Sequence, residues 1–259
     1  MKAIKKTPIL LFVFIFFYFI DLETSEPLIC IEANCKNTEN IQCLQIFSER
    51  CSGSTYVTKL LKKNILTNNG KRLAKSPFGR KHFPPDFNLP ISEWHGPREM
   101  YTFEQSENTV FLILFRNPYD WLQSLNRTPH HASRSLRKLP FSQFIRSPWK
   151  LDNEQITVQN NRKWNRLVDM NSSTESPHEN PMKLRSAKIR LFLEIPKRVD
   201  NYYIVKYEKA LNEPQKFIHE FCTIFNLKRA DVYQPISTYK GLGKTHFTLR
   251  ATLPFPLTI

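Results

Sequence analysis

The sequence predicts an α/β protein with a mostly parallel β-sheet flanked by helices. Apolar runs of strand length alternate along the chain with segments of helical periodicity, which is typical of βαβ units. One run, Thr109–Phe115, is continuously apolar after its first residue, as expected for a parallel strand covered on both faces. The 259 residues are enough for one sizeable core and too few for two comfortable ones.

The first strand and helix are predicted within residues 41–64. Residues 41–47 fit a short, largely buried strand, and apolar residues recur at helical spacing from Tyr56 to Leu61. Small and hydroxylated residues around Gly53 lie between them. This arrangement binds phosphate in many proteins, because backbone N–H groups at a helix start converge on an anion. A well-capped helix without a ligand explains the same residues, and the loop lacks the lysine of a Walker A motif.

The later elements follow the same alternation. A short strand is expected to end near His82, before two prolines, and residues 86–108 are loop-rich. Pro118 suits the first turn of a helix that follows the Thr109–Phe115 strand. Further helices are predicted over residues 141–149, 154–168, 182–194 and 213–226, and a further strand over residues 201–207.

The amino terminus has the pattern of a targeting signal. Three lysines precede an unbroken apolar run from Pro8 to Ile20, which would form about 20 Å of helix, short of the roughly 30 Å hydrocarbon core. No small-residue cleavage site follows it. We expect residues 1–25 to be an uncleaved signal-anchor or a signal peptide, followed by a stem over residues 26–40. The protein would then be a single-pass type II protein of a Golgi or other secretory-pathway membrane, or be secreted if cleaved.

Charge and cysteine content narrow the class of partner. The net charge of +15 favours a polyanion, and no long basic run supports nucleic acid. Cys30 and Cys35 could pair in an oxidising lumen. No cysteine spacing indicates a zinc site. Asn126 and Asn171 begin glycosylation sequons, of which the second is expected to be usable because it lies in a polar loop.

Two motifs directly follow two of the predicted strands, at the carboxyl ends where open α/β sheets bind ligands. The first is Ser52-Gly53-Ser54-Thr55, and the second is Arg116-Asn117-Pro118-Tyr119-Asp120 with Ser124 eight residues after its arginine. The pair resembles the motifs of the sulfotransferases that use 3′-phosphoadenosine 5′-phosphosulfate (PAPS), which have a P-loop NTPase-like fold. The resemblance implies a sulfotransferase domain over residues 41–259. Its first motif would hold the 5′-phosphosulfate, and its second would hold the 3′-phosphate.

Weaker matches extend the resemblance toward residue 248. The segment Arg80-Lys81-His82-Phe83-Pro84 is similar to one whose histidine is the general base of cytosolic members. Tyr207-Glu208 is similar to a segment whose tyrosine lies beside the adenine. Lys240-Gly241 resembles a late Arg-Lys-Gly segment that binds the cofactor.

One position departs from the family's pattern. Cytosolic members carry a lysine directly before the Ser-Gly pair, and Golgi members often carry an arginine. This chain has Cys51 there, with Arg50 one residue earlier. Either Arg50 or Lys81 is therefore expected to reach the bridging oxygen of the donor.

The resemblance implies transfer of a sulfuryl group from PAPS to a hydroxyl or amine of an acceptor, without a metal ion. His82 is the expected base, since the ordinary pKa of histidine lies near neutrality, and Glu49 and the pair His130 and His131 are its rivals. The catalytic residues implied are His82, Lys81 and Arg50. The cofactor-binding residues implied are Arg50, Cys51, Ser52, Gly53, Ser54, Thr55, Arg116, Ser124, Tyr207, Lys240 and Gly241.

The expected acceptor is an anionic carbohydrate or glycoconjugate, which the basic surface and the secretory signal favour over a small phenol or steroid. Tyrosine on a secreted protein stays open. A P-loop kinase-like phosphotransferase would share the sheet, but the Gly-Lys-Ser/Thr sequence is missing. A non-catalytic glycan-binding protein with the same fold would have lost cofactor binding, yet both phosphate motifs are present.

Overall fold

The computed structural model describes residues 30–36, 39–76, 78, 81–82, 102–150, 169–171 and 176–236. The predicted membrane segment, the predicted helix over residues 154–168, and Lys240 and Gly241 lie outside the described residues. Within those ranges, no helix combines the length and the apolar character needed to cross a bilayer.

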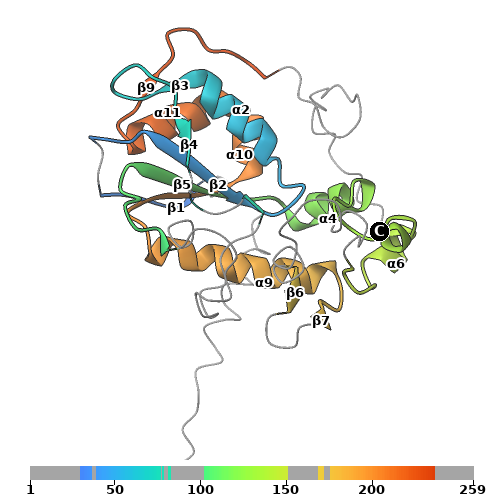
Figure 1. Ribbon diagram of the computed structural model, residues 1–259. Helices are drawn as coiled ribbons and strands as arrows, with labels where there is room; N and C mark the ends of the chain where they lie inside the picture. The colour runs from blue at the N-terminus through green and yellow to red at the C-terminus, as the bar shows by residue number, and fades with distance from the viewer. Residues whose placement is uncertain are drawn as a thin grey trace, which may run out of the picture.

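A five-stranded sheet forms the centre of the described structure (Figure 1). Its strands lie in the order β1 (Cys30–Cys35), β8 (Asn201–Lys206), β5 (Thr109–Phe115), β2 (Cys43–Ser48) and β4 (Ala74–Lys75). The last four are mutually parallel, and β1 pairs with β8 in the antiparallel direction. The predicted α/β class and the mostly parallel sheet flanked by helices are therefore confirmed.

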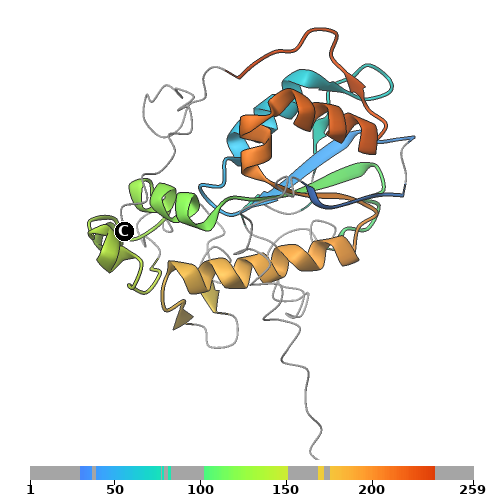
Figure 2. The same ribbon diagram turned by 180° about the vertical axis from the view of Figure 1, so that it is seen from behind.

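Helices cover both faces of the sheet, as Figures 1 and 2 show. The helices α2 (Ser54–Asn64), α10 (Tyr207–Asn212) and α11 (Pro214–Ile224) lie on one face, and α9 (Pro181–Glu194) lies on the other. Buried side chains from the sheet contribute to a separate apolar core on each face. This double cover explains why β5 is apolar along its length, since its residues alternate between the two cores.

A small lobe follows β5 and has a core of its own. It contains α4 (Pro118–Arg127), α5 (Arg134–Arg137) and α6 (Phe141–Phe144), and its buried side chains include two tryptophans. The remaining short elements are β3 (Ile65–Leu66), β6 (Met170–Asn171), β7 (Ser176–Pro177), the 3₁₀ turn η2 (Ile195–Lys197) and β9 (Lys228–Arg229).

Three expectations about local structure are corrected. The helix predicted over residues 141–149 ends at Phe144, and Pro148 could not have continued it because proline lacks an N–H donor. The short strand predicted near His82 lies earlier, as β4, and Lys81 and His82 form a turn instead. The predicted stem over residues 26–40 contains β1, which pairs with β8 at the edge of the sheet.

The predicted pairing of Cys30 with Cys35 is also wrong. The two residues are the ends of one strand, β1. A strand rises about 3.3 Å per residue, so their Cα atoms lie roughly 16 Å apart, whereas a disulfide needs less than about 7 Å.

Candidate functional site

The candidate site lies where the order of the strands changes direction along the chain. From β2 the chain continues to β4 on one side, whereas from β5 it continues to β8 on the other. Ser48, Phe115 and Lys206 end three neighbouring parallel strands at the same edge of the sheet. Ligands of open α/β sheets bind beside such a reversal. The two phosphate motifs predicted from the sequence begin at this edge.

The loop after β2 has the geometry of an anion site. Gly53 is the N-cap of α2 with a φ of 79°, and Cys51 has a φ of 64°, so the chain turns sharply into the helix. No side chain caps α2, and no acidic residue lies in its first turn. The positive end of the helix dipole therefore faces Ser52 and Gly53 without a competing carboxylate in that turn.

Tyr207 packs directly on this loop. A Cβ atom on Gly53 would lie 2.1 Å from Cε2 of Tyr207, so only glycine permits the contact. The guanidinium of Arg116 lies over the same ring, 5.3 Å from its centroid. Tyr207, which follows β8, thus contacts both Gly53 after β2 and Arg116 after β5.

The second motif also meets the first loop at Cys51. Nη1 of Arg116 donates to the Cys51 carbonyl oxygen at 2.9 Å. The Cys51 thiol donates to the Thr128 carbonyl oxygen at 3.4 Å, and Ser124 lies close enough to the thiol to lower its pKa. Burial raises the pKa of that thiol to about 11, against the lowering effect of the nearby arginines, so the thiol is protonated at neutral pH. Arg116 and Ser124 therefore both lie beside Cys51, in the loop after β2.

Lys81 and His82 lie against the end of β2. Nζ of Lys81 donates to Oγ1 of Thr55 at 3.3 Å, and the Ser48 N–H donates to the Lys81 carbonyl at 2.8 Å. Nδ1 of His82 lies 2.8 Å from the Ser48 carbonyl oxygen. Because a carbonyl can only accept, Nδ1 carries the proton and Nε2 carries the lone pair. Burial, together with Lys81, lowers the pKa of His82 to about 3, so the ring is neutral, and the near-neutral pKa expected from the sequence is corrected.

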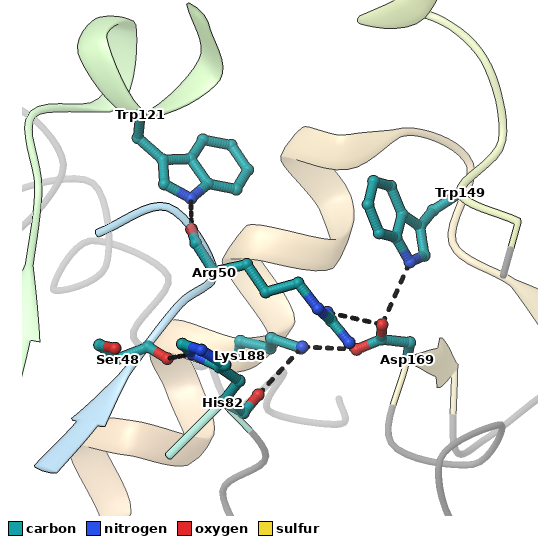
Figure 3. Close-up of polar contacts among 7 residues, drawn as sticks. All are labelled: Ser48, Arg50, His82, Trp121, Trp149, Asp169 and Lys188. Carbon is teal, nitrogen blue, oxygen red and sulfur yellow. Dashed lines mark hydrogen bonds and ion pairs between the residues drawn. The ribbon is translucent and has the colours of Figure 1, made fainter. Parts of the chain in front are cut away.

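Arg50 is in a buried ion pair. Its side chain is 5% exposed, and its Nη1 lies 2.7 Å from Oδ2 of the fully buried Asp169 (Figure 3). Asp169 also accepts from Nε1 of Trp149 at 3.2 Å and pairs with Lys188 at 2.5 Å. Burial alone would raise the pKa of this carboxyl, but Arg50 and Lys188 outweigh it and lower the pKa to about 2. Of the two cations predicted at the donor's bridging oxygen, Lys81 is the one that contacts the loop.

A second buried pair joins Glu49 to α9. Oε1 of Glu49, which is 1% exposed, lies 3.0 Å from Nε of Arg185. Burial raises the pKa of Glu49 to about 7, although Arg185 and Lys188 counteract it. Nη2 of Arg185 also donates to the Arg116 carbonyl oxygen at 2.6 Å. A small pocket at this junction is lined by Glu49, Arg50, Trp121, Leu125, Trp149, Leu184, Arg185 and Lys188.

The other predicted residues are placed as follows. Burial lowers the pKa of His130 and His131, and the charge of Arg50 lowers it further. Both histidines therefore lie within electrostatic range of Arg50. Asn126 falls on α4. Asn171, expected in a polar loop, falls instead in the short strand β6. The described ranges contain no group of His, Cys, Asp and Glu side chains that could hold a metal ion.

Sequence reasoning missed the residues that pack beneath the loops: Asp169, Arg185, Lys188 and Trp149. A signal for two of them was present in the helix predicted over residues 182–194. The buried positions of α9 follow helical spacing, and Arg185 and Lys188 occupy two of them. Charged residues at core positions mark a buried polar cluster.

No protein-family model matches this chain, and no curated protein matches it in sequence.

Proposed function

We propose that the chain is a PAPS-dependent sulfotransferase with a P-loop NTPase-like sulfotransferase fold. The observation that carries the proposal is the meeting of two phosphate-binding motifs at Cys51. The loop Ser52-Gly53-Ser54-Thr55 follows β2, and Arg116 and Ser124 follow the neighbouring parallel strand β5. Both segments lie beside Cys51, next to the reversal of strand order. A ligand with two separated phosphate groups suits this pair of sites better than a single anion does.

Each motif has a distinct role in the proposal. The hydroxyls of the Ser52–Thr55 loop and the N–H groups at the start of α2 hold the 5′-phosphosulfate. Arg116 and Ser124 hold the 3′-phosphate, and Tyr207 lies beside the adenine. Lys240 and Gly241 belong to the same cofactor site on the strength of the sequence resemblance. The uncapped first turn of α2 and the Gly53–Tyr207 contact are compatible with these roles.

His82 and Lys81 perform the chemistry of transfer in this proposal. PAPS supplies the sulfuryl group when it is bound. His82 accepts the proton of the acceptor hydroxyl or amine at Nε2 while the acceptor atom bonds to sulfur. Lys81 stabilises the electron pair left on the phosphate oxygen when the bond between that oxygen and sulfur breaks. Arg50 supports the site from its ion pair with Asp169.

The proposed acceptor is an anionic carbohydrate or glycoconjugate, and the proposed location is a Golgi or other secretory-pathway membrane. The net charge of +15 and the apolar run from Pro8 to Ile20 support these assignments. A kinase-like phosphotransferase is less well supported. The loop has no lysine within it, and Arg116, rather than a metal-binding carboxylate, follows β5.

Calorimetry on the full chain in detergent tests the proposal. Adenosine 3′,5′-bisphosphate should bind without Mg²⁺ and raise the melting temperature. Radiolabelled PAPS should then label an acidic polysaccharide. Binding of ATP with Mg²⁺, with no binding of the bisphosphate, would support the phosphotransferase. Binding of an acidic polysaccharide, with no binding of the bisphosphate, would support the glycan-binding protein.

A further inference from the structure

Two cations of α9 are buried beneath the candidate site. Arg185 and Lys188 lie one helical turn apart, and they are 7% and 3% exposed. Their positions belong to the face of α9 that otherwise carries Leu184 and Phe192. A buried cation is costly unless its hydrogen bonds and charge are satisfied, and an apolar residue would be the simpler occupant. What these side chains contact therefore indicates their purpose.

Lys188 connects Asp169 to His82. Its Nζ pairs with Oδ1 of Asp169 at 2.5 Å and donates to the carbonyl oxygen of His82 at 3.1 Å (Figure 3). The ring of His82 is held from the other side by the Ser48 carbonyl, and the Ser48 N–H holds the preceding residue, Lys81. Both the ring and the backbone of His82 are thus fixed, one by β2 and the other by α9.

Arg185 connects the starting points of the two phosphate motifs. It pairs with Glu49, the residue directly after β2, and donates to the carbonyl of Arg116, the residue directly after β5. Its guanidinium also packs over the Trp121 ring at 4.6 Å, and Nε1 of Trp121 donates to the Arg50 carbonyl at 2.8 Å. One side chain therefore spans the ends of two neighbouring strands.

We propose that Lys188 and Arg185 are positioning residues with separate tasks. Lys188, oriented by Asp169, holds His82 in the tautomer and place in which Nε2 accepts a proton. Arg185 holds the loop after β2 and the segment after β5 at the separation that suits a nucleotide with two phosphate groups. The assignment of tasks rests on the proposed function, but the effect of Lys188 on His82 does not.

Lys188 and Arg185 can each be replaced by methionine without leaving a buried ion that has no partner. Lys188→Met leaves Arg50 and Asp169 as a neutral pair. Arg185→Met removes the charge that most strongly lowers the pKa of the buried Glu49 carboxyl, so this carboxyl is protonated more readily than in the wild type. Lys183→Met and Arg190→Met are matched controls, because both residues are exposed cations on the same helix.

Three measurements on the full chain in detergent separate the tasks. Histidine-selective NMR reports the tautomer of His82, calorimetry reports the affinity for adenosine 3′,5′-bisphosphate, and thermal unfolding confirms the fold. Lys188→Met should mix the tautomers of His82 and change the bisphosphate affinity less than about twofold, and Lys188→Arg should restore the single tautomer. Arg185→Met should weaken the bisphosphate by about tenfold or more, the equivalent of a lost charge-assisted hydrogen bond, and leave the His82 signals unchanged.

The proposal is overturned if both variants lower the melting temperature while the tautomer and the bisphosphate affinity stay as in the two control variants. It is also overturned if each variant changes both readouts equally. If the wild-type chain does not bind bisphosphate, the proposed function has failed. The NMR measurement then still decides whether Lys188 positions His82.

Discussion

At Gly53 the loop after β2 and the ring of Tyr207 approach closer than any side chain on that position would permit. Two features of Gly53 would oppose a larger residue, its positive φ of 79° and its close contact with Tyr207. A second glycine, Gly70, has the first feature without the second, so it allows the two effects to be measured separately. Gly70 has a φ of 71°, and no heavy atom lies within 4 Å of the place where its Cβ atom would be. Gly70→Ala therefore measures the backbone effect alone, about 1–2 kcal/mol.

We expect Gly53→Ala to cost more than Gly70→Ala and to reduce bisphosphate affinity, because the added methyl group must displace Tyr207 from the loop. The total loss of stability should reach about 2–4 kcal/mol, the sum of backbone strain and overpacking. Urea unfolding and calorimetry on both variants measure this. Equal losses in the two variants would show that the Tyr207 contact is easily rearranged.

His82 is the residue on which the proposed chemistry depends most. His82→Ala should lower turnover by roughly 10²–10⁴ while the affinity for bisphosphate changes little, because a base acts in the transition state. Initial rates with radiolabelled PAPS and calorimetry give the two quantities.

The rival bases supply the controls for this experiment. Glu49→Gln and the two variants His130→Ala and His131→Ala should retain more turnover than His82→Ala. Near-full turnover of His82→Ala together with loss of turnover in Glu49→Gln would assign the base to Glu49, whose raised pKa of about 7 suits that role.

At the scale of elements, the parts that could be predicted from the sequence are those that repeat a periodic pattern. β5 and β8 were evident from their apolar runs, and α11 from its helical spacing. β1 could not be recognised in this way, since an antiparallel edge strand carries only a short stretch of mixed polarity.

In the candidate site, too, the residues that belong to a local sequence pattern were predicted, and those that meet only in the folded chain were not. The loop after β2 and Arg116 were predicted because each directly follows an apolar strand. The ion pairs of Asp169 with Arg50 and Lys188 were not predicted, because the three residues are far apart in the sequence and meet only through folding. Local patterns carry no information about such long-range ion pairs.

The ion-pair cluster of Arg50, Asp169 and Lys188 predicts which single substitution within it destabilises the fold most. Asp169 balances two cations, whereas Arg50 and Lys188 each share one carboxylate. Asp169→Asn should therefore be the most destabilising of the three single changes, at about 3–5 kcal/mol, because it leaves two buried cations side by side. Arg50→Met and Lys188→Met each leave a neutral pair and should cost less.

Urea unfolding of the three variants measures this order, and the double variant Asp169→Asn with Lys188→Met should recover part of the loss. Arg190→Met, an exposed change on the same helix, serves as the control. If Asp169→Asn proves no worse than Lys188→Met, charge balance does not determine the stability of this cluster.

For the whole molecule, the stability should depend on pH through His82 and Glu49, whose contributions to the free energy of unfolding change in opposite directions as the pH rises. The pKa of His82 is lowered from 6.5 to about 3, mainly by burial, so its contribution is complete above pH 6.5 and is lost as the pH falls toward 3. The pKa of Glu49 is raised from 4.5 to about 7, mainly by burial, so its contribution is complete below pH 4.5 and is lost as the pH rises toward 7.

We expect Glu49→Gln to gain stability relative to the wild type as the pH rises from 4.5 to 7. His82→Gln should lose less stability than the wild type as the pH falls from 6.5 to 3. Urea unfolding across this range measures both, with Glu194→Gln, a change at a partly exposed carboxylate, as the control. A constant difference between Glu49→Gln and the wild type would contradict the assignment to Glu49.

The short distance along the chain between the apolar run and β1 limits how far the candidate site can lie from a membrane. If the apolar run from Pro8 to Ile20 is an anchor, as proposed, only nine residues separate it from the first residue of β1. Nine residues reach at most about 30 Å when fully extended. The proposed active site would then stay close to the bilayer, and its acceptors would have to reach the bilayer surface: glycans of neighbouring membrane glycoconjugates, or long polysaccharide chains that extend along that surface.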